Sequence, residues 1–183
     1  MKFSRRDALA LAFAALTASA ALADDADDQN TLIMELKHGK VVIKLRPDLA
    51  PKHVAQIKAL VAKKFYDGLT FHRVIDGFMA QTGDPKGTGE GGSDLPNIPA
   101  EFTKTPFKRG TLGMARTEDP NSANSQFFIC FADASFLNGK YTVFGEVTSG
   151  MDVVDKIKKG DAASNGTVTN PDKIIKLRFA SSK

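Results

Sequence analysis

The feature that most constrains the fold of this chain is a series of short segments in which every second residue is apolar. In residues 40–46, Val41, Ile43 and Leu45 alternate with neighbours that include Lys44 and Arg46. This alternation has the two-residue period of a half-buried β-strand. Glycine and asparagine separate eight candidate strands, which are Thr31–Leu36, Lys40–Arg46, Thr70–Ile75, Phe78–Thr82, Thr111–Ala115, Gln126–Cys130, Thr142–Val147 and Ile174–Phe179.

Only two segments favour a helix. Between Pro51 and about Phe65 the apolar residues Val54, Ile57 and Val61 recur on one helical face, and proline suits the first helical turn. A second, short helix is predicted over Met151–Lys158. Because two helices do not alternate with eight strands, the order argues against a doubly wound sheet. It favours a mainly β protein, an antiparallel barrel or sandwich with helices at its ends.

Residues 1–23 have the pattern of a signal peptide. Lys2, Arg5 and Arg6 form a positive start, an alanine-rich stretch follows, and Ala21-Leu22-Ala23 fits a signal-peptidase site. The apolar stretch is short and mild for a hydrocarbon layer of about 30 Å, so we expect no membrane anchor after cleavage. Residues 4–9 also resemble a twin-arginine signal, so both this export route and the general secretory route stay open. A periplasmic location is expected.

The remaining chain is long enough for one domain and too short for two. We expect residues 24–30 to form a short flexible leader and residues 31–183 to form the domain. Cleavage would lower the formal net charge from +4 to +2, and lysines and arginines are dispersed, so nucleic acid is not an expected partner. Cys130 is the only cysteine, which excludes an internal disulfide and predicts a buried, inert thiol.

Three motif matches lack the context that their chemistry needs. Residues 87–92 (GTGEGG) contain a G-x-G-x-x-G, but Pro96 and Pro99 follow in place of the helix that would hold a pyrophosphate. The three histidines have no ligand-like spacing and no cysteine pair supplements them. Ser125 lacks a G-x-S-x-G frame. We therefore expect no cofactor, no metal and no hydrolytic nucleophile.

A candidate binding surface surrounds Arg73. Strand parity puts Arg73 on one face and His72 on the other, so one can be buried while the other meets a ligand. A turn at Asp76-Gly77 brings three further side chains back beside this strand, namely Phe78 and Met79, which would be exposed there, and Gln81. When this segment is considered alone, an alternative interpretation also explains it, namely that Arg73 is a surface arginine in a salt bridge above ordinary core residues.

A second cluster follows downstream. In residues 125–129, Gln126 and Phe128 share one strand face, and Phe127 and Ile129 point the other way. With residues 136–145 in view, the sequence resembles the cyclophilin family. The matching segments, in order, are FHRVIDGFMAQTGD at 71–84, a Gly-rich loop with GTG, LGMA at 112–115, SQFFI at 125–129 and FLNGKYTVFGEV at 136–147. The resemblance runs from about Thr31 to Phe179.

The resemblance implies a closed eight-stranded antiparallel β-barrel capped by two α-helices, and a peptidyl-prolyl cis/trans isomerase that assists the folding of exported proteins. Carried over position by position, Arg73 matches the catalytic arginine. The positions that match the pocket for the substrate proline and the groove beside it are Phe78, Met79, Gln81, Ala115, Gln126, Phe128, Phe136, Leu137 and Tyr141. His72 matches a histidine with a structural role.

Two departures from the family pattern bear on ligands. Phe136 stands where tryptophan is common and removes an indole N–H donor, so weak cyclosporin binding is expected. Tyr141 replaces a histidine but keeps an aromatic wall with a polar tip, so binding of proline-containing polypeptides should survive. A monomer is expected. Two alternatives stay open, a proline-binding module without turnover and an unrelated barrel that encloses a small apolar ligand.

Overall fold

The computed structural model describes residues 29–182. The predicted signal peptide and all but the last two residues of the predicted leader lie outside this range. Eight strands form, β1 (Thr31–Leu36), β2 (Gly39–Leu45), β3 (Arg73–Ile75), β4 (Met79–Thr82), β5 (Thr111–Met114), β6 (Phe127–Cys130), β7 (Val143–Ser149) and β8 (Lys176–Phe179). The helical segments are α2 (Pro51–Ala62), α3 (Met151–Val154) and the 3-10 turns η1 (Ser135–Leu137) and η2 (Ala162–Ser164).

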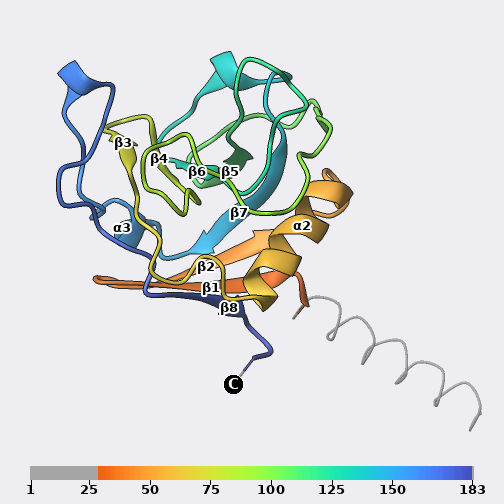
Figure 1. Ribbon diagram of the computed structural model, residues 1–183, viewed down its shortest axis with the longest axis horizontal. Helices are drawn as coiled ribbons and strands as arrows, with labels where there is room; N and C mark the ends of the chain where they lie inside the picture. The colour runs from red at the N-terminus through yellow and green to blue at the C-terminus, as the bar shows by residue number, and fades with distance from the viewer. Residues whose placement is uncertain (1–28, 183) are drawn as a thin grey trace, which may run out of the picture.

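All eight strands belong to one antiparallel sheet in the order β3-β4-β6-β5-β7-β2-β1-β8. In Figure 1, β1, β2 and β8 lie together at the base while β3, β4, β5 and β6 curl above them. The prediction of a mainly β barrel-like fold is confirmed. The word "closed" overstates it, because the outer strands β3 and β8 do not pair, and only the segments before them meet, through a bridge between Thr70 and Lys173.

Each end of the curled sheet is covered by a helix, α2 at one and α3 at the other (Figure 1). The predicted helix over residues 51–65 stops earlier, at Ala62, because Lys64 turns into the left-handed region with φ 56°. The predicted helix over residues 151–158 keeps only its first turn and continues as turns to Ile157. No helix among the described residues is long and apolar enough to cross a membrane.

The sheet is apolar on both faces in the β4–β6 region. Inward-facing residues such as Ala80, Phe127 and Ile129 join the main core, which also takes the apolar faces of α2 and α3. Outward-facing Met79, Phe128 and Cys130 form a second, smaller cluster with Phe107, Ala134, Leu137 and Val143. The parity predicted for residues 126–129 is thus present, and burial raises the pKa of the Cys130 thiol to about 12. This second cluster is the floor of the groove described next.

Candidate active site

Cross-strand register places the key side chains in one row on the outer face of the sheet. Arg73 on β3 pairs with Gln81 on β4, Gln81 pairs with Phe128 on β6, and Phe128 pairs with Gly113 on β5. A glycine at 113 is required because a Cβ there would lie 2.4 Å from Cζ of Phe128. The sheet therefore sets the guanidinium and the Phe128 ring in one row, with Gln81 between them.

A cavity of about 380 Å³ opens above this row. Its apolar half is made of six side chains, Phe78, Met79, Phe128, Phe136, Leu137 and Tyr141. Phe128 stacks on Phe107 with ring centroids 5.8 Å apart and meets the Tyr141 ring edge-on at 5.9 Å. These contacts fix an apolar depression of the size that suits a small ring.

The side chains of the apolar half differ sharply in exposure. Met79 is 1% exposed, so the expectation of an exposed methionine beside Arg73 was wrong. Its place on the middle strand β4, with β3 and β6 on either side, accounts for this burial. Phe136, on η1, is 60% exposed and leans against Phe78 with centroids 5.2 Å apart. The floor is therefore part of the core, while the rim is an aromatic wall that is open to solvent.

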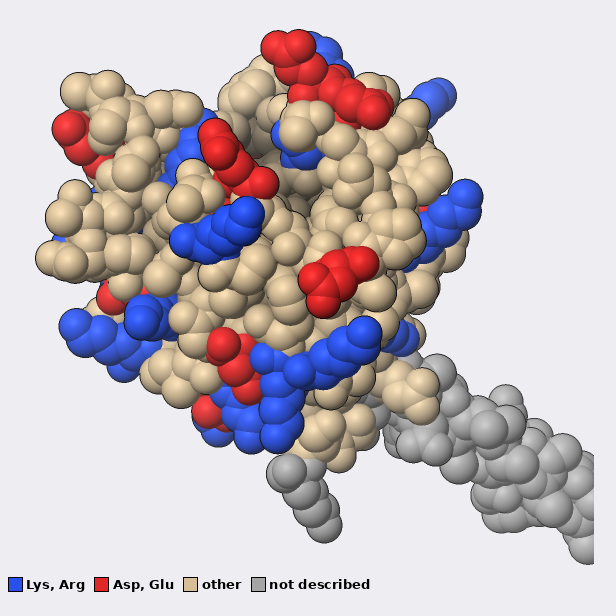
Figure 2. All heavy atoms as spheres, in the orientation of Figure 1, with Lys and Arg blue, Asp and Glu red and all other residues tan. Residues whose placement is uncertain are grey.

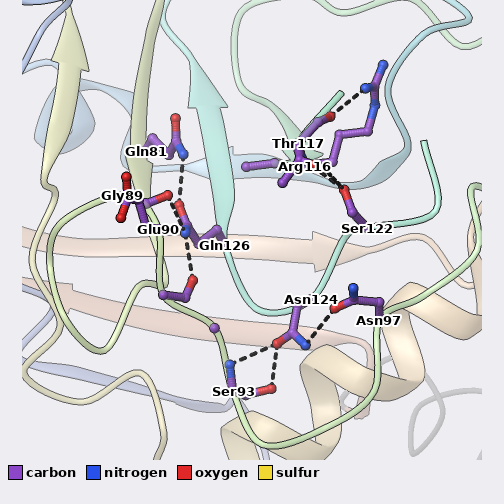
Figure 3. A pocket seen from close by; sticks show the side chains of 13 residues that line it. Gln81, Gly89, Glu90, Ser93, Asn97, Arg116, Thr117, Ser122, Asn124 and Gln126 are labelled. Atoms are coloured by element: carbon purple, nitrogen blue, oxygen red, sulfur yellow. Dashed lines mark hydrogen bonds between the residues drawn. The ribbon is translucent and has the colours of Figure 1, made fainter. Parts of the chain in front are cut away.

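The polar half of the groove consists of Arg73, Gln81 and Gln126, joined by hydrogen bonds. Nη1 of Arg73 donates to Oε1 of Gln81 (3.2 Å), and Nε2 of Gln81 donates to Oε1 of Gln126 (2.9 Å). Nε2 of Gln126 then donates to the carbonyl oxygens of Gly89 and Gly91, at 2.9 and 2.7 Å. Figure 3 shows the part of this chain that runs from Gln81 to the Gly-rich loop. The position of the guanidinium is thus tied to that loop.

Arg73 keeps an unneutralised charge. No ion pair within 4.0 Å joins it to a carboxylate among residues 29–182. The remaining acceptors belong to Asn165, whose backbone oxygen takes Nε–H (3.0 Å) and whose Oδ1 takes Nη2–H (3.0 Å). Partial burial lowers the pKa of Arg73, yet a guanidinium stays protonated at any physiological pH. The salt-bridged reading that the sequence left open is wrong.

A second cavity of about 390 Å³ adjoins the first and shares Gln81, Ala115 and Arg116 with it. Figure 3 shows it lined mainly by amides, hydroxyls and the backbone of the Gly-rich loop. Arg116 lies over the Tyr141 ring, 4.4 Å from its centroid, and donates to the carbonyl oxygens of Thr117, Glu118 and Lys140. Its guanidinium is therefore held at the rim between the two cavities.

The Gly-rich loop is built around Asp84. This carboxylate is 1% exposed and accepts hydrogen bonds from the backbone N–H groups of Lys86, Thr88 and Gly89. Burial alone would raise the pKa of Asp84, but these donors outweigh it and hold the pKa below its usual value. The loop thus encloses an anion supplied by the chain itself, which explains its glycines without any dinucleotide.

The histidines lie away from the groove surface. His72 is buried on the other side of β3 from Arg73, and burial lowers its pKa. His53, at the start of α2, is buried with Nδ1 2.7 Å from Oε2 of Glu101. No group of three or more potential metal ligands occurs within the described part of the chain. On the face in Figure 2, both basic and acidic side chains occur, and basic side chains gather along its lower edge.

Nine of the ten predicted site residues line the first cavity, and Gln126 lines only the second. Sequence reasoning did not include Arg116 in the site, nor Phe107 and Gly113 beneath Phe128. Asn165, which contacts Arg73, was not predicted as a site residue either. Asn165 lies 92 residues from Arg73 along the chain, and no local sequence pattern links the two.

Comparison with known proteins agrees with this geometry. Residues 31–179 match the family model described as "Cyclophilin type peptidyl-prolyl cis-trans isomerase/CLD". A probable peptidyl-prolyl cis-trans isomerase of Brucella suis is 60% identical over 96% of both chains, and one of Helicobacter pylori is 45% identical over 67% of this chain and 77% of its own.

Solved structures give the same answer. A cyclophilin from Hirschia baltica aligns with a TM-score of 0.76 and 30% identity over 86% of this chain and 76% of its own. A Cryptosporidium parvum cyclophilin-type isomerase, solved in the presence of the dipeptide Ala-Pro, aligns with a TM-score of 0.75 and 28% identity over 83% of this chain and 99% of its own. The chain belongs to the family of cyclophilin-type peptidyl-prolyl cis-trans isomerases.

Proposed function

We propose that this isomerase accelerates rotation about X–Pro bonds in exported polypeptides and thereby assists their folding, with Arg73 as its catalytic residue. The observation that carries the proposal is the placement of a charged guanidinium, held only by neutral acceptors, at the edge of an apolar cavity. The substrate class is a proline-containing segment of an unfolded or partly folded chain.

The chemistry follows from amide resonance. Rotation about an X–Pro bond is slow because resonance must be broken, at a barrier of about 18–20 kcal/mol. In the twisted transition state the proline nitrogen regains its lone pair and becomes a hydrogen-bond acceptor. A guanidinium N–H aimed at this nitrogen stabilises the twisted state more than either planar ground state. By analogy with oxyanion donors, such a bond supplies roughly 2–4 kcal/mol.

The apolar half of the groove supplies the second requirement. Phe128, Met79 and Leu137 would hold the proline ring while the rest of the peptide turns, and they would keep water away from the reacting amide. Gln81 can anchor a neighbouring carbonyl, since its amide lies beside Arg73. This mechanism transfers no proton and forms no covalent bond, so it asks for no nucleophile and no general base.

Two alternative functions are weaker. A proline-binding module without turnover would keep the apolar half but would have no use for an unneutralised arginine beside it. A barrel that encloses a small ligand would need an empty interior, whereas main-core side chains such as Met34, Phe127 and Phe144 fill it.

We further propose that the chain is exported to the periplasm and cleaved after Ala23. The support is the positive start, the alanine-rich stretch and the Ala-Leu-Ala site in residues 1–23. Expression of the full chain in a Gram-negative host, with fractionation and N-terminal mass analysis, tests it. A periplasmic form that starts at Asp24 is expected. An intact N-terminus in the cytoplasm would contradict the proposal.

The activity test is cis/trans exchange in a short X–Pro peptide, followed by NMR exchange spectroscopy. Wild-type protein should give fast exchange, and Arg73→Ala should lower kcat/KM at least about tenfold, or 1.4 kcal/mol, without a change in thermal stability. Peptide binding with no accelerated exchange in either protein would support the binding module. Wild-type turnover by Arg73→Ala would remove Arg73 from the catalytic role.

A further inference from the structure

The loop of residues 160–168, called the Asn165 loop below, covers the free edge of β3. Backbone N–H of Val74 donates to the Gly166 oxygen (2.8 Å), Gly160 N–H donates to the Val74 oxygen (2.9 Å), and Val168 N–H donates to the His72 oxygen (3.1 Å). In Figure 1 this loop is the blue segment with a short helix beside β3. It is therefore anchored to the strand that carries Arg73.

Because the loop is bonded to β3, Asn165 lies where it can hold one edge of the Arg73 guanidinium. Its backbone oxygen accepts from Nε and its Oδ1 accepts from Nη2, both at 3.0 Å, while Gln81 accepts from Nη1 on the other side. An arginine has five N–H groups, so these three bonds leave one free N–H on each terminal nitrogen. The guanidinium is fixed in direction and can still donate to a ligand.

The residue type at 165 matters for the charge as well as the geometry. An aspartate in the same place would keep the contact with Nη2 and form a charge-assisted ion pair with Arg73. That pair would hold the side chain but cancel the positive charge that a substrate nitrogen would meet. An asparagine oxygen gives the same geometry without the charge.

Local backbone also favours asparagine. Asn165 ends η2 in the left-handed region (φ 55°, ψ 33°), which asparagine adopts more readily than most residues. Asp161 stabilises the turn, because its side chain accepts from Ala163 N–H and its backbone oxygen accepts from Gly166 N–H. Gly166 follows because a Cβ there would lie 2.5 Å from Cγ1 of Ile75. The loop thus presents both oxygens of Asn165 in a defined direction.

We propose that Asn165 is a positioning residue of the isomerase, which orients the Arg73 guanidinium through two neutral acceptors and leaves its charge available to the substrate. The proposal rests on the proposed catalytic role of Arg73. It assigns a role in the reaction to a turn that sequence analysis leaves without one.

Two substitutions separate the geometric and the electrostatic parts. Asn165→Gly keeps the left-handed backbone and the Nε acceptor but removes Oδ1, and kcat/KM should fall about threefold to tenfold, mainly through kcat. Asn165→Asp keeps the shape of the side chain but neutralises the charge of Arg73. Its kcat should fall at least as far as that of Asn165→Gly, although the aspartate holds the guanidinium more strongly. A purely structural role predicts the reverse for aspartate, with activity preserved.

Asn170 provides a matched control. It is exposed, also left-handed (φ 52°), and its side chain makes no hydrogen bond within the described residues. Asn170→Gly and Asn170→Asp should therefore keep wild-type kcat and KM. Thermal melting of all four variants corrects each rate for the folded fraction. A loss of activity that only follows the folded fraction would overturn the proposal.

A double substitution shows whether Asn165 acts through Arg73. In the Arg73→Ala background, Asn165→Gly should cause no further loss of kcat, and a full additional loss would overturn the proposal. If Arg73→Ala is impaired and both Asn165 variants turn over like wild type, only the role of Asn165 fails. If Arg73→Ala itself turns over like wild type, the catalytic assignment of Arg73 fails and this inference with it.

Discussion

In the apolar half of the groove, Phe128 and Met79 are almost fully buried and belong to a packed cluster, whereas in the polar half Arg73 and Gln81 are partly exposed and are held by hydrogen bonds. The apolar side chains thus contribute to folding as well as to the proposed binding of proline. The polar side chains contribute little packing, so they can be chosen for chemistry alone. This contrast predicts that substitutions in the two halves have different consequences.

The largest expected effect comes from the floor of the apolar half. Phe128→Ala should lower the free energy of unfolding by about 3–5 kcal/mol, because it leaves a cavity against Phe107 and Tyr141. Urea denaturation measures this loss. Phe136→Ala is the matched control on the exposed rim, and it should change stability by less than about 1 kcal/mol while raising KM. Equal stability losses in the two variants would contradict the division between floor and rim.

The second expected effect is on stability at acid pH, and it comes from two buried histidines outside the groove. Burial lowers the pKa of His72 and of His53, the latter despite its contact with Glu101. Below about pH 6.5 the unfolded chain therefore takes up protons that the folded chain does not, and the free energy of unfolding falls as pH falls.

Each buried histidine contributes a slope of at most about 1.4 kcal/mol per pH unit. Chemical denaturation between pH 7.5 and 5.5 measures the sum of these slopes. His72→Gln should reduce the slope. A free energy of unfolding that does not change over this range would show that the two histidines take up protons as readily in the folded chain as in the unfolded chain.

The smallest expected effect is at the rim. Phe136→Trp restores an indole N–H, and one added hydrogen bond should tighten cyclosporin binding about threefold to tenfold. Turnover of a short X–Pro peptide should stay within about twofold, because the floor and Arg73 are untouched. Calorimetric titration measures the affinity, and Phe136→Leu is the control that adds no donor. Equal affinity of the tryptophan and leucine variants would show that an indole N–H at this position does not set the affinity for cyclosporin.

The two halves also differ in how well the sequence predicts them. Strand alternation put Phe127 and Phe128 on opposite faces, as observed, and gave β1 its observed bounds, while the resemblance to cyclophilins supplied the residues of the apolar half. The predicted strand over residues 70–75 is shorter in the structure, since Thr70 makes only one bridge, to Lys173. Strand length at an edge depends on partners that local pattern does not reveal.

The polar half depends on contacts between distant segments. The resemblance to cyclophilins named Arg73, Gln81 and Gln126, but not the acceptors that hold them. Gln126 reaches the Gly89 and Gly91 oxygens, 37 and 35 residues away, and Arg73 reaches Asn165, 92 residues away. Such bonds arise from loop conformation, which no local pattern in residues 87–92 or 165–166 predicts.

The most direct test of the account is the substitution Arg73→Lys, with peptide affinity and exchange rate measured on the same sample by NMR. Lysine keeps the charge but lacks the planar fork that bonds to Asn165 and Gln81 while leaving donors free. We expect near wild-type affinity for the peptide and an exchange rate at saturating peptide that is reduced at least about tenfold. Wild-type exchange by Arg73→Lys would contradict it, because a positive charge alone, without a held guanidinium, would then suffice.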